Sequence, residues 1–179
     1  GQEREIAVLF ADLRDFTRLS EGRLPYDVVF LLNRYFRGMA QAVEGAGGQI
    51  DKFIGDGVMA LFGLRSDAAT GCRQALAAAR AMAAELADMN RALQQDLPQP
   101  LRLGIGLHVG PAIVGEMGAG RAVSVTAIGD TVNTASRLES LTKDFAAELV
   151  LSEAVAEKAG LDLDWARREE TTVRGRQEP

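Results

Sequence analysis

The chain has 179 residues, of which 47% are apolar and 25% are charged, and its formal net charge is −5. This composition is typical of a globular domain and excludes a disordered or fibrous chain. The single cysteine, Cys72, excludes an intramolecular disulfide framework and a cysteine-based zinc site, and the single histidine, His108, excludes a site that needs two histidines. We assign no chemistry to either residue and expect both to pack.

No apolar run approaches the roughly 20 residues of a membrane-spanning helix, and no block of Lys and Arg marks a nucleic-acid binder. The sequence carries no secretory signal, which favours a reducing, cytoplasmic location. It also lacks repeats and Pro/Ser linkers, so residues 1–179 are interpreted as one domain. Because the chain enters structure directly after Gly1, we expect a domain excised from a longer protein, with a regulatory domain upstream and a membrane tether left open.

Hydrophobic spacing predicts the elements in chain order. The apolar run 6–11 predicts a buried strand, and residues 25–44 and 67–96 carry apolar side chains at helical spacing. Between these helices, Gly55-Asp56-Gly57 separates two strand-like runs, which predicts a hairpin. Three further strands are predicted over 101–109, 112–116 and 123–128, the last two joined across the turn 118–120.

The remaining elements complete the predicted fold. Asp130 is predicted to cap a helix that runs through Leu141, and strands over 148–151 and 163–173 flank a short helix from Ser152. This order predicts an α+β fold, a ferredoxin-like βαββαβ core sandwich with additional strands and helices. Such a fold supports many functions, so the function has to be argued from side chains.

Two aspartates are the first candidates for chemistry. Asp12 ends the first strand and Asp56 lies in the hairpin turn. Taken singly, Asp12 is explained as a helix cap and Asp56 as an ordinary turn residue. A hairpin beside the first strand brings both carboxylates together, and with a backbone carbonyl they form a hard-oxygen site suited to two Mg²⁺ ions, the usual device for displacement at phosphorus. The loop after Asp12 leads into a helix whose N–H groups suit phosphate.

Four more polar residues have two explanations each. Asn133 and Arg137 are four residues apart on one predicted helix face. Arg137 is either a surface ion-pair partner, for instance of Glu139, or it joins Asn133 in orienting a sugar and neutralising a phosphoryl transition state. Lys52 lies on a mostly apolar strand face, which is unusual unless it meets a partner, and Thr126 is also explained by its β propensity.

Three segments, VLFADLRDFTRLSE, KFIGDGVMALFG and TAIGDTVNTASRLE, together resemble the catalytic domain of the class III nucleotidyl cyclases, the adenylyl and guanylyl cyclases. The resemblance extends from Ile6 to Arg176. It implies that Asp12 and Asp56, with the Leu13 carbonyl, bind two Mg²⁺ or Mn²⁺ ions per site. It further implies that the loop 13–17 holds the triphosphate through Phe16 and Thr17, and that Arg174 binds phosphate. In the same family pattern, Asn133 orients the ribose and Arg137 stabilises the transition state. The resemblance implies that Lys52 and Thr126 select the base.

The sequence departs from the family pattern at two places. Asp15 stands where the family commonly has glycine, which makes the phosphate loop more acidic and reduces its backbone freedom. Arg174 stands where the family often has a lysine, and the chain stops at Pro179, where related domains usually add another strand.

The base-selecting pair indicates the substrate. Adenine offers an acceptor at N1 and a donor amine at N6, to which Lys52 donates and from which Thr126 accepts. Guanine reverses both positions and leaves buried polar groups unpaired, which costs a few kcal/mol. We therefore predict ATP as the substrate, with 3′,5′-cyclic AMP and pyrophosphate as products. The Lys/Thr pair also resembles a subgroup that includes bicarbonate-responsive cyclases, which adds bicarbonate as a candidate regulator.

Other functions stay open at this stage. A guanylyl cyclase is the runner-up. A degenerate cyclase-homology module typically loses a metal aspartate or the arginine, and all three are present here. A diguanylate cyclase carries a Gly-Gly-Asp/Glu-Glu-Phe hairpin, which Gly55-Asp56-Gly57 does not match. Because Lys52 and Asp56 flank one hairpin but belong to opposite sides of the family's cleft, we predict a head-to-tail homodimer with two shared sites.

Overall fold

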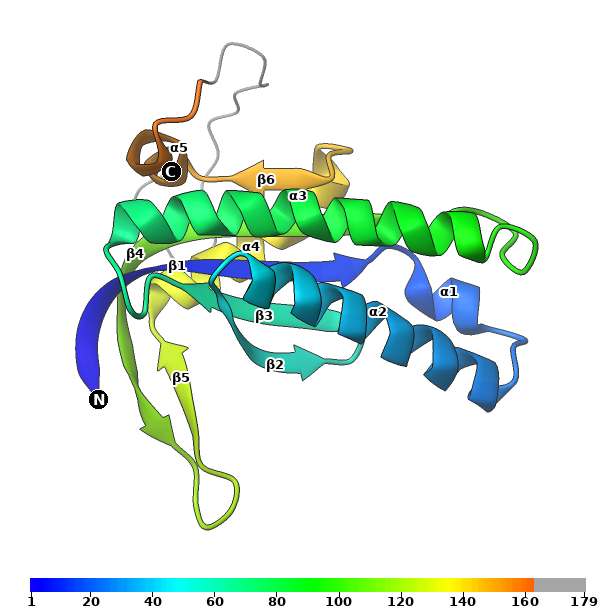
Figure 1. The fold of residues 1–179 in the computed structure, drawn as a ribbon, viewed down its shortest axis with the longest axis horizontal. Helices are drawn as coiled ribbons and strands as arrows, with labels where there is room; N and C mark the ends of the chain where they lie inside the picture. The colour runs from blue at the N-terminus through cyan, green and yellow to red at the C-terminus, as the bar shows by residue number, and fades with distance from the viewer. Residues whose placement is uncertain (163–179) are drawn as a thin grey trace.

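The structure, a computed structural model, describes residues 1–162 and is built around a six-stranded sheet (Figure 1). Its strands are β1 (Gln2–Leu13), β2 (Gln49–Ile54), β3 (Gly57–Phe62), β4 (Leu103–Met117), β5 (Ser124–Ile128) and β6 (Leu149–Leu151). Its helices are α1 (Phe16–Ser20), α2 (Pro25–Gly45), α3 (Ala68–Ala92), α4 (Asp130–Asp144) and α5 (Glu153–Ala159). Within the described range, no helix is both long and apolar enough to cross a membrane.

The central strand order confirms the predicted core. The strands follow the order β2-β3-β1-β4-β5 with antiparallel neighbours, and β6 pairs in parallel with β4. The sequence of elements β1-α2-β2-β3-α3-β4 is the βαββαβ unit, with its last strand beside its first. The extra elements β5, α4, β6 and α5 follow this core.

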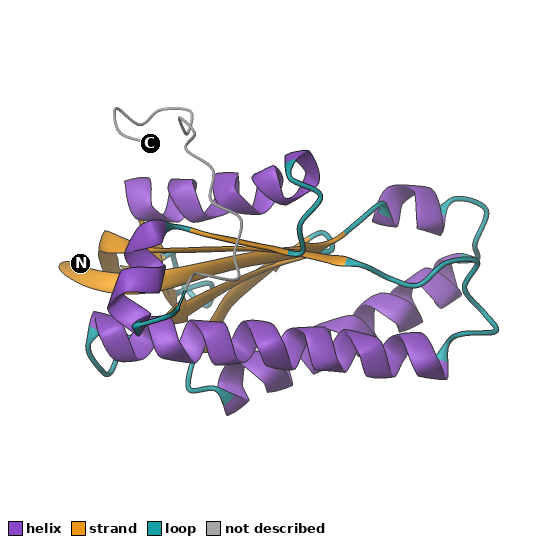
Figure 2. Cartoon of the chain, turned by 90° about the horizontal axis from the view of Figure 1, so that it is seen from above, coloured by secondary structure: helices purple, strands orange, loops and turns teal. Residues whose placement is uncertain are grey.

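Helices cover both faces of the sheet, as the edge-on view in Figure 2 shows. Alternation along β1 decides which side chains meet which layer. Ala7, Leu9, Ala11 and Leu13 join a buried cluster with residues of α2 and α3, whereas Ile6 and Val8 join a second cluster with Ala135 of α4. Asp12 follows the even-numbered set, so its side chain starts from the face that α4 covers.

Glycines on β4 let α4 approach the sheet closely. Gly104, Gly106 and Gly110 alternate with the buried residues Ile105, Leu107 and Val109. A Cβ atom on Gly106 would lie 2.3 Å from the Glu139 nitrogen, and one on Gly110 would lie 2.6 Å from Thr131 Oγ1. Backbone therefore packs on backbone here, and the position of α4 is fixed to within a side chain's width.

The first strand and the long helix are confirmed with shifted ends. The expected strand 6–11 lies inside β1, whose polar residues 2–5 are extended because they pair with residues 111–114 of β4. The expected helix 67–96 becomes α3, which ends at Ala92. Asp67 is its N-cap and accepts a hydrogen bond from the Thr70 N–H at 2.7 Å.

Two expectations in the second half are wrong. The strands predicted over 101–109 and 112–116 are one strand, β4, because β1 continues opposite the suspected break and pairs Glu5 with Pro111. Asp130 does not cap α4: the N-cap is Gly129, whose φ of 136° suits glycine, and Asp130 is the first helical residue. There its charge still favours the helix N-terminus.

The end of the chain is confirmed only as far as residue 162. β6 and α5 match the expected strand and short helix, and Ser152 accepts a hydrogen bond from the Val155 N–H as N-cap of α5. His108 and Cys72 are buried, as expected. The strand predicted over 163–173 lies outside the described residues.

Alanine at Gly106 is expected to destabilise the domain. The new Cβ would collide with backbone atoms of α4, namely the Glu139 nitrogen and the Ala135 oxygen, so the helix has to move. We expect Gly106→Ala to lower the free energy of unfolding by about 1–3 kcal/mol in urea denaturation.

Gly45→Ala is the matched control, because among the described residues nothing lies within 4 Å of a Cβ at that helical position. It should leave stability unchanged or raise it by up to about 1 kcal/mol. Equal stability of the two variants would contradict the close packing of α4 on β4.

Candidate active site

Strand pairing brings the two predicted metal-binding aspartates together. Asp12, near the end of β1, pairs with Gly57 on β3 and with Gly104 on β4. Asp56 lies in the two-residue turn between β2 and β3, directly before Gly57. The hairpin places Asp56 next to Asp12, as the sequence predicted.

The two carboxylates line one cavity of about 580 Å³ at this end of the sheet. Leu13, Phe16 and Thr17 of the predicted phosphate loop line the same cavity. The remaining lining residues are charged: Asp15, Arg18, Glu21 and Lys143. The structure therefore brings together Asp12, Leu13, Phe16, Thr17 and Asp56, which were predicted to hold metal and triphosphate, and adds Lys143 from the end of α4.

A third carboxyl group, that of Glu139 on α4, lies next to the Asp12 side chain. It is buried, with 9% of its surface exposed, and neither Glu139 Oε1 nor Asp12 Oδ1 has a hydrogen-bond partner within the described part of the chain. Burial, the close approach of the Asp12 carboxyl group and the charge of Asp12 raise the pKa of Glu139 to about 8. The suggested ion pair between Glu139 and Arg137 is not formed, because Glu139 faces the sheet whereas Arg137 is exposed.

The cluster also perturbs its neighbours. Burial raises the pKa of Asp56, hydrogen bonds from the backbone N–H groups of Asp56 and Leu13 offset part of this rise, and the charge of Asp12 adds to it. Tyr35 of α2 is fully buried beneath the cluster, and burial followed by the charges of Asp56, Asp12 and Glu139 raises its pKa above its usual value. In each of these groups burial is the largest cause of the raised pKa and neighbouring carboxylates add to it, a combination that marks a candidate functional site.

The departure at Asp15 has a visible structural consequence. Asp15 adopts a left-handed backbone, with φ 54° and ψ 28°, and is the N-cap of α1 without a side-chain hydrogen bond. Glycine favours this conformation and aspartate tolerates it. The loop therefore keeps a glycine-type backbone at the cost of some strain.

The residues predicted to select the base lie elsewhere. Lys52 is on β2 and Thr126 on β5, the two ends of the central strand order. A shift in register after Ile50 breaks the alternation on β2, so Lys52 does not share a face with Ile50 and the expected apolar strand face is interrupted there. Lys52 Nζ lies 3.2 Å from Oδ2 of the buried Asp51, which is the partner that the lysine needed.

Thr126 and the α4 pair complete the predicted set. Thr126 is buried, and its Oγ1 has no hydrogen-bond partner among residues 1–162. Asn133 and Arg137 are exposed on one face of α4, as expected, while Ala135 and Leu138 face the core. None of Lys52, Thr126, Asn133 and Arg137 lines the carboxylate cavity of the same chain. Arg174 lies outside the described residues.

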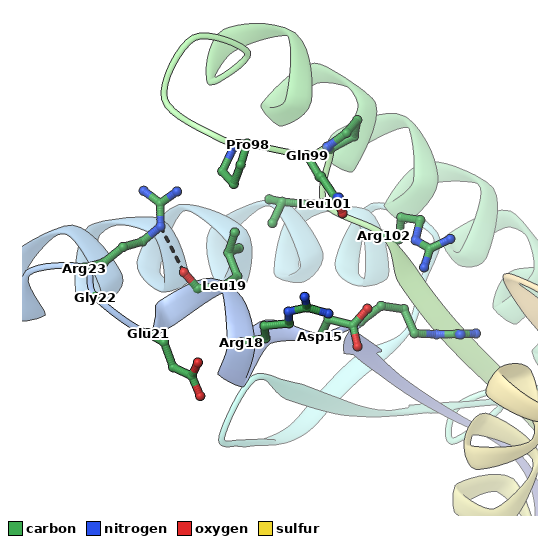
Figure 3. A pocket seen from close by; sticks show the side chains of 12 residues that line it. Asp15, Arg18, Leu19, Glu21, Gly22, Arg23, Pro98, Gln99, Leu101 and Arg102 are labelled. Atoms are coloured by element: carbon green, nitrogen blue, oxygen red, sulfur yellow. Dashed lines mark hydrogen bonds between the residues drawn. The ribbon is translucent and has the colours of Figure 1, made fainter.

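A neighbouring cavity of about 590 Å³ shares Asp15, Arg18 and Glu21 with the carboxylate cavity and continues toward the α3–β4 connection (Figure 3). Arg23 crosses its rim, where Nε donates to the Leu19 carbonyl at 3.0 Å. Asp15 and Glu21 lie among its arginines, so the charges in this cavity are mixed.

The oxygen atoms around Asp12 fit a pair of Mg²⁺ or Mn²⁺ ions. The donors are two carboxylates and a main-chain carbonyl, the hard ligands that these ions prefer. Among residues 1–162, Asp12 Oδ1 is buried and has no hydrogen-bond partner, so it is available as a metal ligand. Within residues 1–162, no group of three or more His, Cys, Asp or Glu side chains is arranged to hold a metal ion, so the fit rests on the two carboxylates and the carbonyl.

Comparison with known proteins agrees with these features. The family described as the adenylate and guanylate cyclase catalytic domain matches residues 1–179. An adenylate cyclase of Anabaena cylindrica is 40% identical over 157 residues, covering 85% of this chain and 30% of that protein. Adenylate cyclase 1 of Rhizobium meliloti is 37% identical over 152 residues, covering 85% of this chain and 23% of that protein. The chain belongs to the class III nucleotidyl cyclase catalytic domain family and spans less than a third of these relatives.

Solved structures of a guanylyl cyclase and of an adenylyl cyclase both have the same fold as this chain. The crystal structure of the guanylyl cyclase Cya2 matches with a TM-score of 0.89 at 33% identity, covering 100% of this chain and 90% of that one. The adenylyl cyclase CyaB from P. aeruginosa matches with a TM-score of 0.86 at 31% identity, covering 99% of this chain and 91% of that one. Similarity of fold therefore does not choose between ATP and GTP.

The stability of the metal-free domain should fall as the pH rises through the range in which Glu139 titrates. The pKa of Glu139 is about 8 in the fold, against an ordinary value of 4.5, so between these values the unfolded chain binds fewer protons than the folded chain. The free energy of unfolding then falls by up to about 1.4 kcal/mol per pH unit.

Glu139→Gln removes this contribution. In urea denaturation with a chelator present, the stability difference in favour of the variant should grow from about pH 5 to about pH 8. A difference that does not change with pH would contradict a protonated Glu139.

Proposed function

We propose that the domain is an adenylate cyclase, which converts ATP into 3′,5′-cyclic AMP and pyrophosphate in signal transduction. The observation that carries this proposal is the convergence of Asp12, Asp56 and the loop residues Phe16 and Thr17 on one cavity. Because no metal aspartate and no site arginine is lost, an inactive cyclase-homology module is disfavoured. The names of the two curated relatives support the choice of ATP.

Base selection is assigned to Lys52 and Thr126. The Lys52 ammonium has three donors, so it donates to adenine N1 while it keeps its ion pair with Asp51. The Thr126 hydroxyl has no hydrogen-bond partner among residues 1–162, so its oxygen is available to accept from the N6 amine. Guanylate cyclase is the second candidate, supported by the likeness to Cya2.

The proposed catalytic roles rest on the charges in the cavity and on the family resemblance. Asp12, Asp56 and the Leu13 carbonyl would hold two Mg²⁺ or Mn²⁺ ions, whose charge would acidify the ribose 3′-hydroxyl and stabilise the leaving pyrophosphate. Asn133 holds the ribose in line for attack, and Arg137 stabilises the charge on the α-phosphoryl group in the transition state.

These roles require a second chain. Asn133 and Arg137 do not line the carboxylate cavity of their own chain, so we infer a head-to-tail homodimer in which each site takes its aspartates from one chain and its base- and ribose-binding residues from the other. Exposed apolar side chains support an interface along α2, β2 and the β4–β5 hairpin, which projects from the body in Figure 1. They are Leu24, Tyr26, Val29, Phe30, Phe53, Ile54, Ile113, Val123, Val125 and Ile128.

The remaining assignments rest on less. A phosphate contact by Arg174 and regulation by bicarbonate rest on the family resemblance, the latter through Thr126 alone. A cytoplasmic location agrees with the free, buried Cys72. Regulation from an upstream domain agrees with the greater length of the curated relatives.

Nucleotide preference should follow the base-selecting pair. With Mg²⁺ or Mn²⁺, the unaltered domain should form cyclic AMP from ATP and much less cyclic GMP from GTP. The double variant Lys52→Glu, Thr126→Cys should lower ATP turnover and raise the relative use of GTP, because its hydrogen-bonding groups match guanine. An unchanged ATP:GTP ratio in a folded, active double variant would contradict the assignment, and a preference of the unaltered domain for GTP would favour guanylate cyclase.

Subunit mixing should restore activity between two inactive variants. Asp56→Ala and Arg137→Ala should each remove nearly all turnover. In a mixed dimer one site carries both defects and the other carries none, so random exchange should recover roughly a quarter of the unaltered activity. No recovery, despite exchange demonstrated with labelled chains, would contradict sites shared between chains.

A further inference from the structure

The carboxylate cavity carries negative charge that has to be compensated by cations before it can bind phosphate. Four of its lining residues are acidic, Asp12, Asp15, Glu21 and Asp56, and Glu139 adds a carboxyl group behind Asp12. A nucleoside triphosphate brings several further negative charges into this space. Protein cations that line the cavity are therefore expected to contact the phosphates.

Two side chains meet this description, Arg18 and Lys143. Arg18 also lines the neighbouring arginine-rich cavity, so its place is shared between the two. Lys143 lines only the carboxylate cavity of these two, and it comes from α4 instead of the loop 13–21. It is exposed, and no ion pair within 4.0 Å engages it among residues 1–162.

The charge of Lys143 is directed at the acidic cluster. It lowers the pKa of both Asp56 and Glu139, against the larger effect of burial on each group. Lys143 lines the same cavity as the two aspartates and the loop residues Phe16 and Thr17.

We propose that Lys143 binds the phosphate chain of the nucleotide, at the part that leaves as pyrophosphate, in the site whose metal-binding aspartates belong to the same chain. This inference rests on the proposed nucleotide cyclase function and adds a residue to it. Helix α4 then serves two sites: its exposed face gives Asn133 and Arg137 to the partner's site, and its last turn gives Lys143 to its own.

A simpler explanation is that Lys143 only stabilises the C-terminal end of α4 through the helix dipole. Lys158 is the matched control for this explanation, because it lies in the last turn of α5, is also exposed, and pairs with Glu5 at 2.8 Å away from the cavity. A role at the helix end predicts the same small effect on stability for Lys143→Met and Lys158→Met, and no effect of either on phosphate binding.

The first experiment is calorimetric titration of the domain with magnesium pyrophosphate, which needs no turnover. Lys143→Met should weaken binding roughly tenfold, Lys143→Arg should restore most of it, and Lys158→Met should leave it unchanged. Equal affinity of Lys143→Met and Lys158→Met would overturn the proposal. If the unaltered domain binds pyrophosphate but forms no cyclic nucleotide, the cyclase function fails while the assignment of Lys143 is still tested.

The second experiment asks which chain supplies the lysine. Lys143→Glu places a further carboxylate in the cavity and should abolish turnover. Mixed with Arg137→Ala it should recover roughly a quarter of the unaltered activity, because one site of the mixed dimer then carries both defects and the other carries none. Mixed with Asp56→Ala it should recover none, because each site of the mixed dimer then carries one defect. Recovery with Asp56→Ala instead would overturn the placement of Lys143 in its own chain's site.

Discussion

The close packing of α4 on β4 is the constraint on which the candidate site depends. Strand β4 carries glycine at every second position from 104 to 110 except 108, and on this face the helix backbone lies where side chains would otherwise stand. Because the helix and the sheet are closely packed at this contact, α4 cannot shift relative to the sheet. Once α4 is fixed in this way, the register of its side chains decides which of them reach Asp12, which face solvent and which reach over the end of the sheet.

That packing also accounts for the electrostatic cost of the site. The buried stripe of α4 contains Thr131, Thr134, Ala135, Leu138, Glu139 and Thr142, so Glu139 is carried into the interior with its apolar neighbours. There it meets Asp12 instead of solvent, and the pKa of Glu139 rises. Within residues 1–162, Asp12, Glu139 and Tyr35 each have a side-chain oxygen without a hydrogen-bond partner, and the three groups lie close enough to affect one another electrostatically. The fold thus gives up stability where a cation would restore it, as functional sites commonly do.

Most of the fold and the acidic half of the site could be predicted from local signals. The hairpin turn at Gly55-Asp56-Gly57 and the apolar run 6–11 suffice to place Asp56 beside Asp12, because antiparallel pairing leaves little freedom. The single strand β4 could not be predicted, since Gly110-Pro111 is a local breaking signal and only long-range pairing with β1 overrides it. The register shift that pairs Lys52 with Asp51 depends on β3 in the same way.

Glu139 and Lys143 show why the rest of the site was missed. Glu139 follows Arg137 by two positions, which suggested a surface partner, yet its spacing from Ala135 and Thr142 places it on the buried stripe. An acidic residue inside an apolar helical stripe is the signal that identifies it. Lys143 follows the stripe by one residue, at the point where α4 passes the end of β1. Its proximity to the aspartates results from helix length and strand length together, and neither can be read from the spacing of Lys143 within its own segment.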